Sequence, residues 1–310
     1  MEMTWILVRQ ILQMFLLAGA GYALFRTRKI SQEGSRALGN ILIYLALPAV
    51  IINGFLVERT PERLTGLLLS AGAAAVLLIL SALVSRLFFR RDAIAAFAGA
   101  FSNPGFFGVP LIVASAGQGA VFYVASFIAF LNIGQWTYGA SILNGQPIRQ
   151  GFRLKKLATA PFIIAMAAGF VLFMAGIKLP APVSGTISTL AALNTPLAMF
   201  TVGIYLAQTD LIGMLKRRTV YAVSAVRLLL IPLISLALLA AVPESLRDMK
   251  LALLLAVSCP VGSNVAVYAQ LYGKDYPYAV ETVVISTLLS IATIPAVTGI
   301  ATRVWAAFPH

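Results

Sequence analysis

Ten runs of mostly apolar residues, each long enough to cross a lipid bilayer, set the main constraint on this chain of 310 residues. A membrane-spanning helix needs about 20 such residues. The sequence therefore predicts an all-α membrane protein with ten transmembrane helices. The expected spans are residues 4–25, 38–57, 64–86, 93–115, 119–143, 157–176, 186–207, 219–241, 250–272 and 278–302.

The composition supports a lipid environment. Hydrophobic residues make up 60% of the chain and charged residues 11%, whereas soluble domains carry roughly 45–50% and about 25%. The first apolar run has no basic region before it and is long for a secretory signal, so we expect it to be a span. Cys259 is the single cysteine, which excludes an intramolecular disulfide.

The net charge of +13 would suit nucleic-acid binding in a soluble protein. Here, however, most lysine and arginine residues fall in the short loops after the odd-numbered spans. That bias is typical of loops on the cytoplasmic side of a membrane. We therefore expect no nucleic-acid partner, and we predict a multi-pass protein of the cell (inner or plasma) membrane with both termini outside.

The ten spans divide into two halves of five, residues 1–150 and 151–310. Each half has a proline in its second span and another in a disrupted fourth span (Pro48 and Pro104; Pro196 and Pro260). An odd number of spans per half reverses the orientation of the second half. The pattern therefore predicts the inverted repeat that is common in secondary transporters.

The disrupted fourth and ninth spans contain the sequences SNPGFFG, residues 102–108, and SCPVGSN, residues 258–264. Proline removes a backbone donor and clashes with the preceding helical turn. Irregular backbone at membrane depth is tolerated only against protein or a water-filled cavity. An opened helix also presents free N–H groups and partial positive charge at its N-terminal end, which suit an anion. We therefore predict a carboxylate-binding site at these breaks.

Four polar side chains lie directly at the two breaks. Asn103 and Asn264 can donate hydrogen bonds to a carboxylate, or each can satisfy only the backbone of its own broken helix. Ser102 and Ser263 have the same two interpretations.

Further candidates lie near the breaks. We expect Phe106 and Phe107 to pack against other hydrophobic side chains rather than to stack on a substrate. Asn194 and Thr195, which precede Pro196, either line the same cavity or relieve the helix kink.

Polar and charged residues inside other spans complete the candidates. Asn132 and Gln135 lie three positions apart and either face the cavity or form a hydrogen bond between helices. Arg227 and Glu281 are candidates for charge recognition or coupling, because a charge inside the membrane is a functional hypothesis by default. Arg227 could attract an anionic substrate, pair with Glu281, or extend to the membrane surface.

Groups for catalysis are scarce. Glu281 is the single acidic residue within a predicted span, and His310, the last residue, is the single histidine. Acid–base, triad or metal-assisted hydrolysis needs clusters of such groups. The sequence therefore predicts no enzyme activity, no metal and no cofactor.

Four motifs in this order resemble the auxin efflux carrier family, which includes bacterial carboxylate carriers and is related to the PIN-type auxin carriers. They are NPGFFGVPL, NTPLAMFTVGIYLA, CPVGSNVAVYAQLYGKD and STLLSIATIP. The resemblance covers the whole chain. It implies the bile acid/sodium symporter (NhaA-like) fold, in which helices 4 and 9 are unwound and cross.

The resemblance also implies roles for segments and residues. Spans 3–5 and 8–10 would form a core, and spans 1, 2, 6 and 7 a scaffold. In the PIN-type relatives an asparagine at each crossover contributes to the substrate site, and those positions match Asn103 and Asn264. The substrate-binding residues expected around them are Pro104, Gly105, Phe106, Pro260, Val261, Ser263, Asn194 and Thr195.

One position departs from the more distant sodium symporters, which have a glutamate before a Val-Gly pair in the ninth helix. Pro260 stands there, before Val261 and Gly262. This departure argues against classical sodium coupling.

Together these features predict a secondary transporter of small organic anions that works by alternating access. Its substrates would be mono- or dicarboxylates such as malonate, malate or auxin-like acids, and its surroundings the lipid bilayer. The alternatives are an ion-coupled symporter of a neutral or cationic solute and a non-transporting sensor on the same fold. Proton or sodium coupling and a homodimer stay open.

Overall fold

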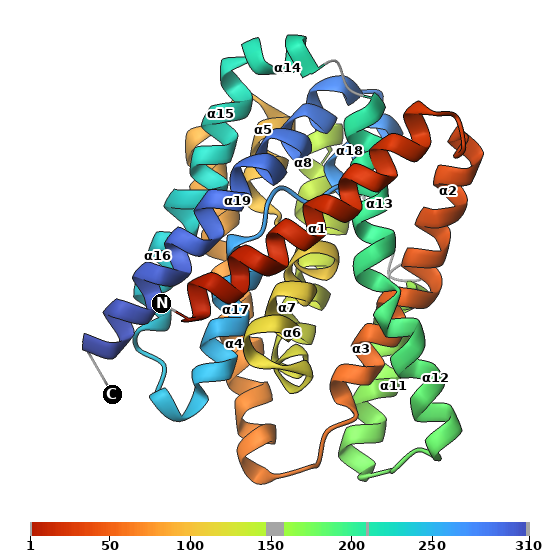
Figure 1. Cartoon of the computed structure of the whole chain (residues 1–310). Helices are drawn as coiled ribbons and strands as arrows, with labels where there is room; N and C mark the ends of the chain where they lie inside the picture. Colours follow the sequence, from red (N-terminus) through yellow and green to blue (C-terminus); the bar gives the residue numbers. More distant parts are fainter. Residues whose placement is uncertain (1, 147–157, 209–210, 308–310) are drawn as a thin grey trace.

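The computed structural model describes residues 2–146, 158–208 and 211–307, and within these ranges it is helical with one isolated β-bridge. The expected all-α membrane architecture is confirmed at this level (Figure 1). The first half contains α1 Glu2–Arg26, α2 Gln32–Ile41, η1 Leu42–Ala46, α3 Leu47–Phe55, α4 Pro61–Phe88, α5 Ala93–Ala100, η2 Pro104–Gly108, α6 Val109–Ala116, η3 Gln118–Ala120, α7 Val121–Gly134, η4 Gln135–Gly139 and α8 Ala140–Asn144.

The second half also combines long and interrupted helices. It contains α11 Pro161–Ala175, α12 Ala181–Ala192, α13 Asn194–Gln208, α14 Leu211–Lys216, α15 Arg218–Ala225, η5 Val226–Leu230, α16 Ile231–Leu239, η6 Glu244–Leu246, α17 Arg247–Ser258, α18 Asn264–Leu271 and α19 Tyr276–Ala307. The basic loop expected after the fifth span lies mostly outside the described residues.

Seven helical stretches within the described ranges are long and apolar enough to cross a membrane. The other three expected spans have different forms. Residues 93–115 and 250–272 are each divided into two shorter helices, and α11 is 15 residues long. The protein is therefore a multi-pass membrane protein, and the count of ten spans stays a prediction.

The two divided spans open next to the expected prolines, but the first opening is shorter than expected because residues 104–108 are helical. α5 ends at Ala100, the chain is extended at Phe101, and helical structure resumes at Pro104. α17 ends at Ser258, Cys259 is extended, and α18 begins at Asn264. Proline starts the second helix after the first break because its missing N–H has no partner to lose in a first turn.

Helix α1 crosses the molecule diagonally and packs closely on α13 (Figure 1). A Cβ atom at Gly203 would lie 1.9 Å from the Ala18 carbonyl oxygen, and one at Gly21 would lie 2.5 Å from that of Phe200. The absence of side chains at both positions lets the two backbones touch, as is common between helices in membranes.

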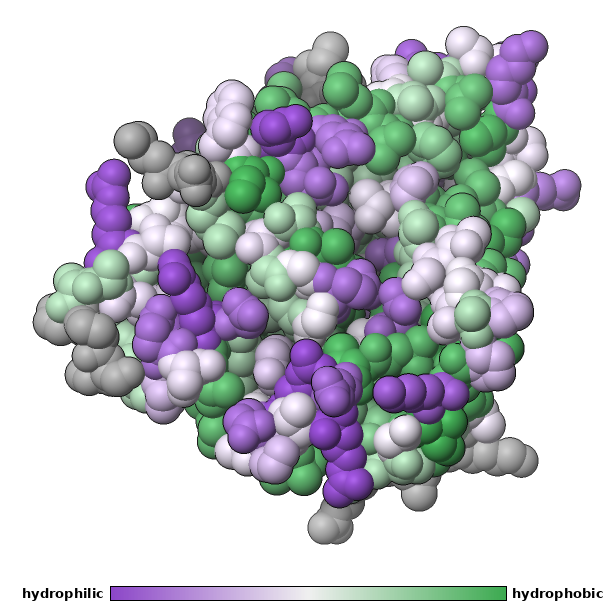
Figure 2. Space-filling model, turned by 60° about the horizontal axis from the view of Figure 1, so that its bottom comes forward, coloured by the Kyte–Doolittle hydropathy of each residue, from purple (hydrophilic) through white to green (hydrophobic). Residues whose placement is uncertain are grey.

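Large hydrophobic side chains cover much of the outer surface. Leu16, Leu68 and Leu83 are among the many that are exposed. Figure 2 shows hydrophilic side chains across the end that carries the α3–α4 and α11–α12 connections, with hydrophobic ones gathered along the upper right flank. Lipid is the environment in which such flanks are stable.

Candidate functional site

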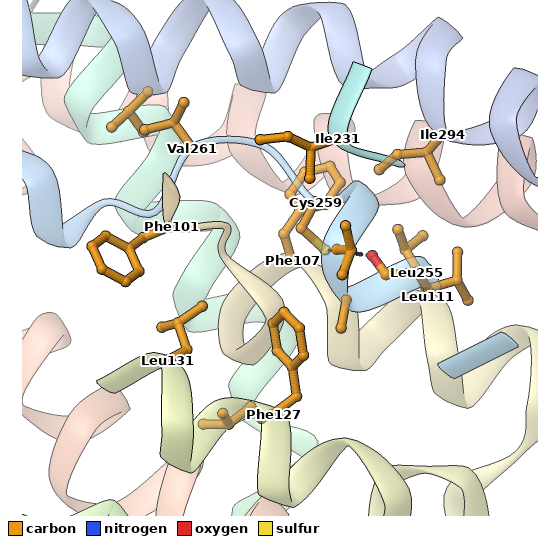
Figure 3. Close-up of a cluster of buried hydrophobic side chains, with 14 of the residues drawn as sticks. Phe101, Phe107, Leu111, Phe127, Leu131, Ile231, Leu255, Cys259, Val261 and Ile294 are labelled. Carbon is orange, nitrogen blue, oxygen red and sulfur yellow. Dashed lines mark hydrogen bonds between the residues drawn. The ribbon is translucent and has the colours of Figure 1, made fainter. Parts of the chain in front are cut away.

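The two helix breaks touch each other through their backbones. Ser102 and Val261 form an isolated antiparallel bridge, and the Gly262 N–H donates to the Phe101 carbonyl oxygen at 2.9 Å. Figure 3 shows Phe101 and Val261 beside this crossing, with Phe107 and Cys259 packed close by. Gly262 permits the contact, because a Cβ atom there would lie 2.8 Å from the Ser102 carbonyl oxygen.

The helices that resume after the breaks start on a common small cavity of about 40 Å³. The first N–H groups of a helix have no intrahelical partner, and Gly105, Phe106, Ser263 and Asn264 occupy these positions. Residues from both breaks and from α3, α7 and η4 line the cavity: Leu47, Ser102, Asn103, Pro104, Gly105, Phe106, Ile128, Leu131, Asn132, Gln135, Gly262, Ser263 and Asn264.

The two crossover asparagines differ in their hydrogen bonds. Asn264 Nδ2 donates to Gln135 Oε1 at 2.7 Å, and Gln135 is almost fully buried. The Asn103 side chain caps no backbone nitrogen and makes no hydrogen bond within the described part of the chain. Asn132 Nδ2 donates to the Ile128 carbonyl oxygen of its own helix at 2.7 Å. Asn103 Nδ2 and Gln135 Nε2 are therefore amide donors at the cavity that make no hydrogen bond to the described residues.

The serines have different surroundings. Ser102 is buried, and its Oγ lacks a hydrogen-bond partner among the residues that the structure describes. Ser263 precedes α18 but its side chain makes no capping hydrogen bond. Both line the cavity, so both hydroxyls are available to a bound group.

Pro260 and Val261 lie in the crossing and not in the cavity wall. The Val261 N–H donates to Ser286 Oγ of α19 at 3.0 Å. The sequence carries no signal for this role of Ser286, because nothing distinguishes it from the other small polar residues of the same helix.

Arg227 neither pairs with Glu281 nor extends to the membrane surface, so both of these interpretations are wrong. It is 1% exposed. Its Nη1 donates to the carbonyl oxygens of Gly99 and Ala100, both at 3.1 Å, and its Nη2 donates to that of Val257. Arg227 therefore holds the C-terminal ends of α5 and α17, the two helices that stop at the breaks.

Glu281 instead accepts a hydrogen bond from Arg217 Nη1 at 3.1 Å, and Arg217 Nη2 contacts Asp275 Oδ2 at 3.2 Å. Glu281 lies in the first turns of α19. The two ion pairs therefore connect the N-terminal end of α19 to the N-terminal end of α15. It is not part of the cavity wall at the breaks.

Asn194 and Thr195 line a neighbouring cavity of about 430 Å³ and not the crossover cavity. Asn194 nevertheless reaches the first break, because its Nδ2 donates to the Gly105 carbonyl oxygen at 3.0 Å. The larger cavity lies between α1, α3, α6, α12 and α13. The expected kink near Pro196 corresponds to the single residue Leu193, which separates α12 from α13.

The two phenylalanines after the first break have separate environments. Phe107 is fully buried in the main hydrophobic cluster, as its side chain in Figure 3 shows. Phe106 is partly buried and lines the crossover cavity. The packing interpretation is therefore confirmed for Phe107, and Phe106 both packs against the hydrophobic clusters and lines the cavity.

The crossover cavity has no acidic or basic side chain in its described wall. No group of three or more histidine, cysteine, aspartate or glutamate residues suited to a metal ion occurs in the described ranges. The polar groups of the crossover cavity are amides, hydroxyls and free backbone N–H groups. Such a site can bind and orient an anion, and its positive helix ends disfavour a cation.

Sequence comparison places the chain among transport proteins. Residues 6–150 and 148–298 match the family described as membrane transport protein. The chain belongs to this family. This family is the auxin efflux carrier family, which the four sequence motifs resemble. A protein of Rhizobium meliloti (strain 1021) named "Putative malonate transporter" is 32% identical over 301 residues, with 92% of each chain covered.

Membership of this family makes the chain a membrane transport protein. The residues that join the two breaks come from both halves of the transporter chain.

The Arg227 contacts could not be predicted from the sequence, because they depend on the rotation of η5 about its axis. The intramembrane charge was the signal that marked the residue.

Proposed function

We propose that this protein is a secondary transporter of small organic anions, mono- or dicarboxylates, in the cell membrane with both termini outside. The observation that carries the proposal is the convergence of two helix N-terminal ends on one cavity with Asn103, Ser102 and Ser263. Free N–H groups and partial positive charge there complement a carboxylate. The name of the Rhizobium meliloti relative supports malonate as the first substrate to test.

The cavity is too small for a dicarboxylate in this conformation. Its volume of about 40 Å³ is well below the roughly 300–1,000 Å³ of typical ligand pockets. Leu47 of α3 closes it on one side: one of its methyl groups would lie 3.2 Å from a Cβ atom at Gly105. Substrate entry therefore requires α3 to separate from the first break.

We further propose that the chain consists of two inverted repeats, residues 1–150 and 151–310, and that each repeat contributes to a scaffold (spans 1, 2, 6 and 7) and to a core (spans 3–5 and 8–10). Within the scaffold, α1 packs on α13, and α3 packs on α11 and α12. Within the core, α4 packs on α5 and α7, and α15 and α18 pack on α19. α1 and α3 also contact α6, α19 and α7 of the core. The Asn194 hydrogen bond to Gly105 then joins scaffold to core, and alternating access has to break it.

Transport assays with purified protein in liposomes test the proposal. We expect uptake of labelled malonate or malate, and Asn103→Ala should lower it about tenfold or more, which corresponds to about 1.4 kcal/mol of lost interaction. Asn264→Ala should also lower uptake. Asn40→Ala is the matched control, because Asn40 is exposed on α2, away from both cavities.

Three results would overturn this proposal. The first is uptake of only neutral or cationic solutes, which would favour a symporter of another substrate class. The second is normal anion uptake by the Asn103→Ala/Asn264→Ala double variant, which would move the site elsewhere. The third is an absence of uptake of any solute under proton or sodium gradients, which would favour a sensor on this fold.

A further inference from the structure

Arg227 is a fully buried cation without an acidic partner in the described part of the chain. It is 1% exposed, and none of the ion pairs of the described residues includes it. Its guanidinium contacts are backbone carbonyl oxygens, two from α5 and one from α17. An isolated buried charge is strongly unfavourable, so these carbonyl groups must supply the compensation.

The helix ends can provide that compensation. The C-terminal end of a helix carries roughly half a negative elementary charge, and its last carbonyl groups lack intrahelical partners. α5 ends at Ala100 and α17 ends at Ser258. Two such ends that meet at one point amount to about one negative charge, which one guanidinium neutralises.

From these contacts we infer that the C-terminal ends of α5 and α17 form a monovalent cation site, which the tethered guanidinium of Arg227 permanently fills. The arginine holds the two broken helices together and is not part of the wall of the crossover cavity. The crossing therefore needs no bound sodium or potassium ion at these carbonyl groups. This inference concerns the architecture and does not depend on which solute the protein carries.

Chemical rescue of Arg227→Ala tests the site without any substrate. The substitution deletes an N-ethylguanidinium group from the side chain. We expect the melting temperature of the purified variant in detergent to fall by several degrees. N-ethylguanidinium chloride at low millimolar concentration should restore much of it in a saturable way, and tetramethylammonium chloride should not.

Controls separate the site from general effects of the salt. Wild-type protein and Arg218→Ala, which removes an exposed arginine from α15, should not respond to N-ethylguanidinium. An Arg227→Ala variant as stable as wild type, or one that responds no more than Arg218→Ala, would overturn the inference.

A second pair of variants applies if Arg227→Ala does not fold. Arg227→Lys keeps a cation near the carbonyl groups, whereas Arg227→Met keeps volume and removes the charge. We expect the lysine variant to melt at the higher temperature. The reverse order, or a methionine variant as stable as wild type, would show that the site needs no cation.

Ion dependence of the wild type gives an independent test. Uptake should be equal when external sodium and potassium are replaced with N-methylglucamine, provided that the proton gradient is unchanged. A strict requirement for either alkali cation would overturn the statement that the crossing needs none. Failure of all anion uptake would count against the proposed function and leave the melting results to decide this inference.

Discussion

At the scale of single residues, Gly262 has no room for a side chain at the crossing of the two breaks. Its N–H bonds to Phe101, and a Cβ atom would lie 2.8 Å from the Ser102 carbonyl oxygen. Gly262→Ala should therefore destabilise the protein by about 1–3 kcal/mol, as overpacking does in other cores. Thermal unfolding in detergent measures this.

The control for Gly262→Ala is Gly72→Ala in α4. Nothing lies within 4 Å of a Cβ atom at Gly72, and alanine is favoured over glycine inside a helix by about 0.5–1 kcal/mol. The melting temperature of this variant should therefore stay equal or rise. Equal behaviour of the two variants would mean that the crossing is looser than its geometry indicates.

The two crossover asparagines should differ in stability although both affect transport. Asn264→Ala leaves the buried Gln135 Oε1 without its donor, which costs about 1–3 kcal/mol. Asn103→Ala removes no hydrogen bond between the described residues, so its unfolding temperature should match the wild type. A similar loss of stability in both variants would contradict the separate roles.

At the scale of helices, the breaks could be predicted from the sequence and their contacts could not. Proline and glycine inside long apolar runs indicated openings within residues 102–108 and 258–264, and the structure opens at 101–103 and 259–263. The meeting of the two openings came from the family resemblance, because local sequence does not fix which helices are neighbours. Asn194 illustrates the limit: its contact with Gly105 depends on how α13 packs against η2.

The packing of α1 on α13 makes its own prediction. Gly203→Ala would place a methyl group 1.9 Å from the Ala18 carbonyl oxygen, so the helices must separate. We expect a loss of at least about 1–3 kcal/mol and a lower yield of folded protein after detergent extraction. Gly185→Ala in α12, where nothing lies within 4 Å, should behave as wild type; a similar loss there would point to a general sensitivity.

At the scale of the whole molecule, the membrane class and the helical architecture could be predicted, because hydrophobic length and composition determine them. Transporter membership followed from the order of the motifs. The division into moving parts stays a prediction, since one conformation does not reveal which groups of helices move.

Cross-linking tests the proposed movement. A Cβ atom at Gly54 would lie 3.3 Å from that of Val121, near the range of disulfides, about 3.5–4.5 Å. In a Cys259→Ser background, oxidation of Gly54→Cys/Val121→Cys should join scaffold to core and stop uptake, and reduction should restore it. Uptake at full rate by the oxidised protein would contradict relative movement at this contact.

The control cross-link lies within the proposed core. A Cβ atom at Gly99 would lie 3.2 Å from that of Ser85, so the Ser85→Cys/Gly99→Cys pair has similar geometry. Its oxidation should leave uptake unchanged, because α4 and α5 would move together.

The contacts of Arg227 also bear on how the protein is made. The carbonyl groups of Gly99 and Ala100 precede Arg227 by 128 and 127 residues. At ordinary elongation rates they are synthesised roughly 6–25 s before the guanidinium exists. During that interval the end of α5 lacks the cation that faces it in the folded protein. A chain that ends before residue 227 therefore cannot complete the crossing, because it has neither the guanidinium nor α17.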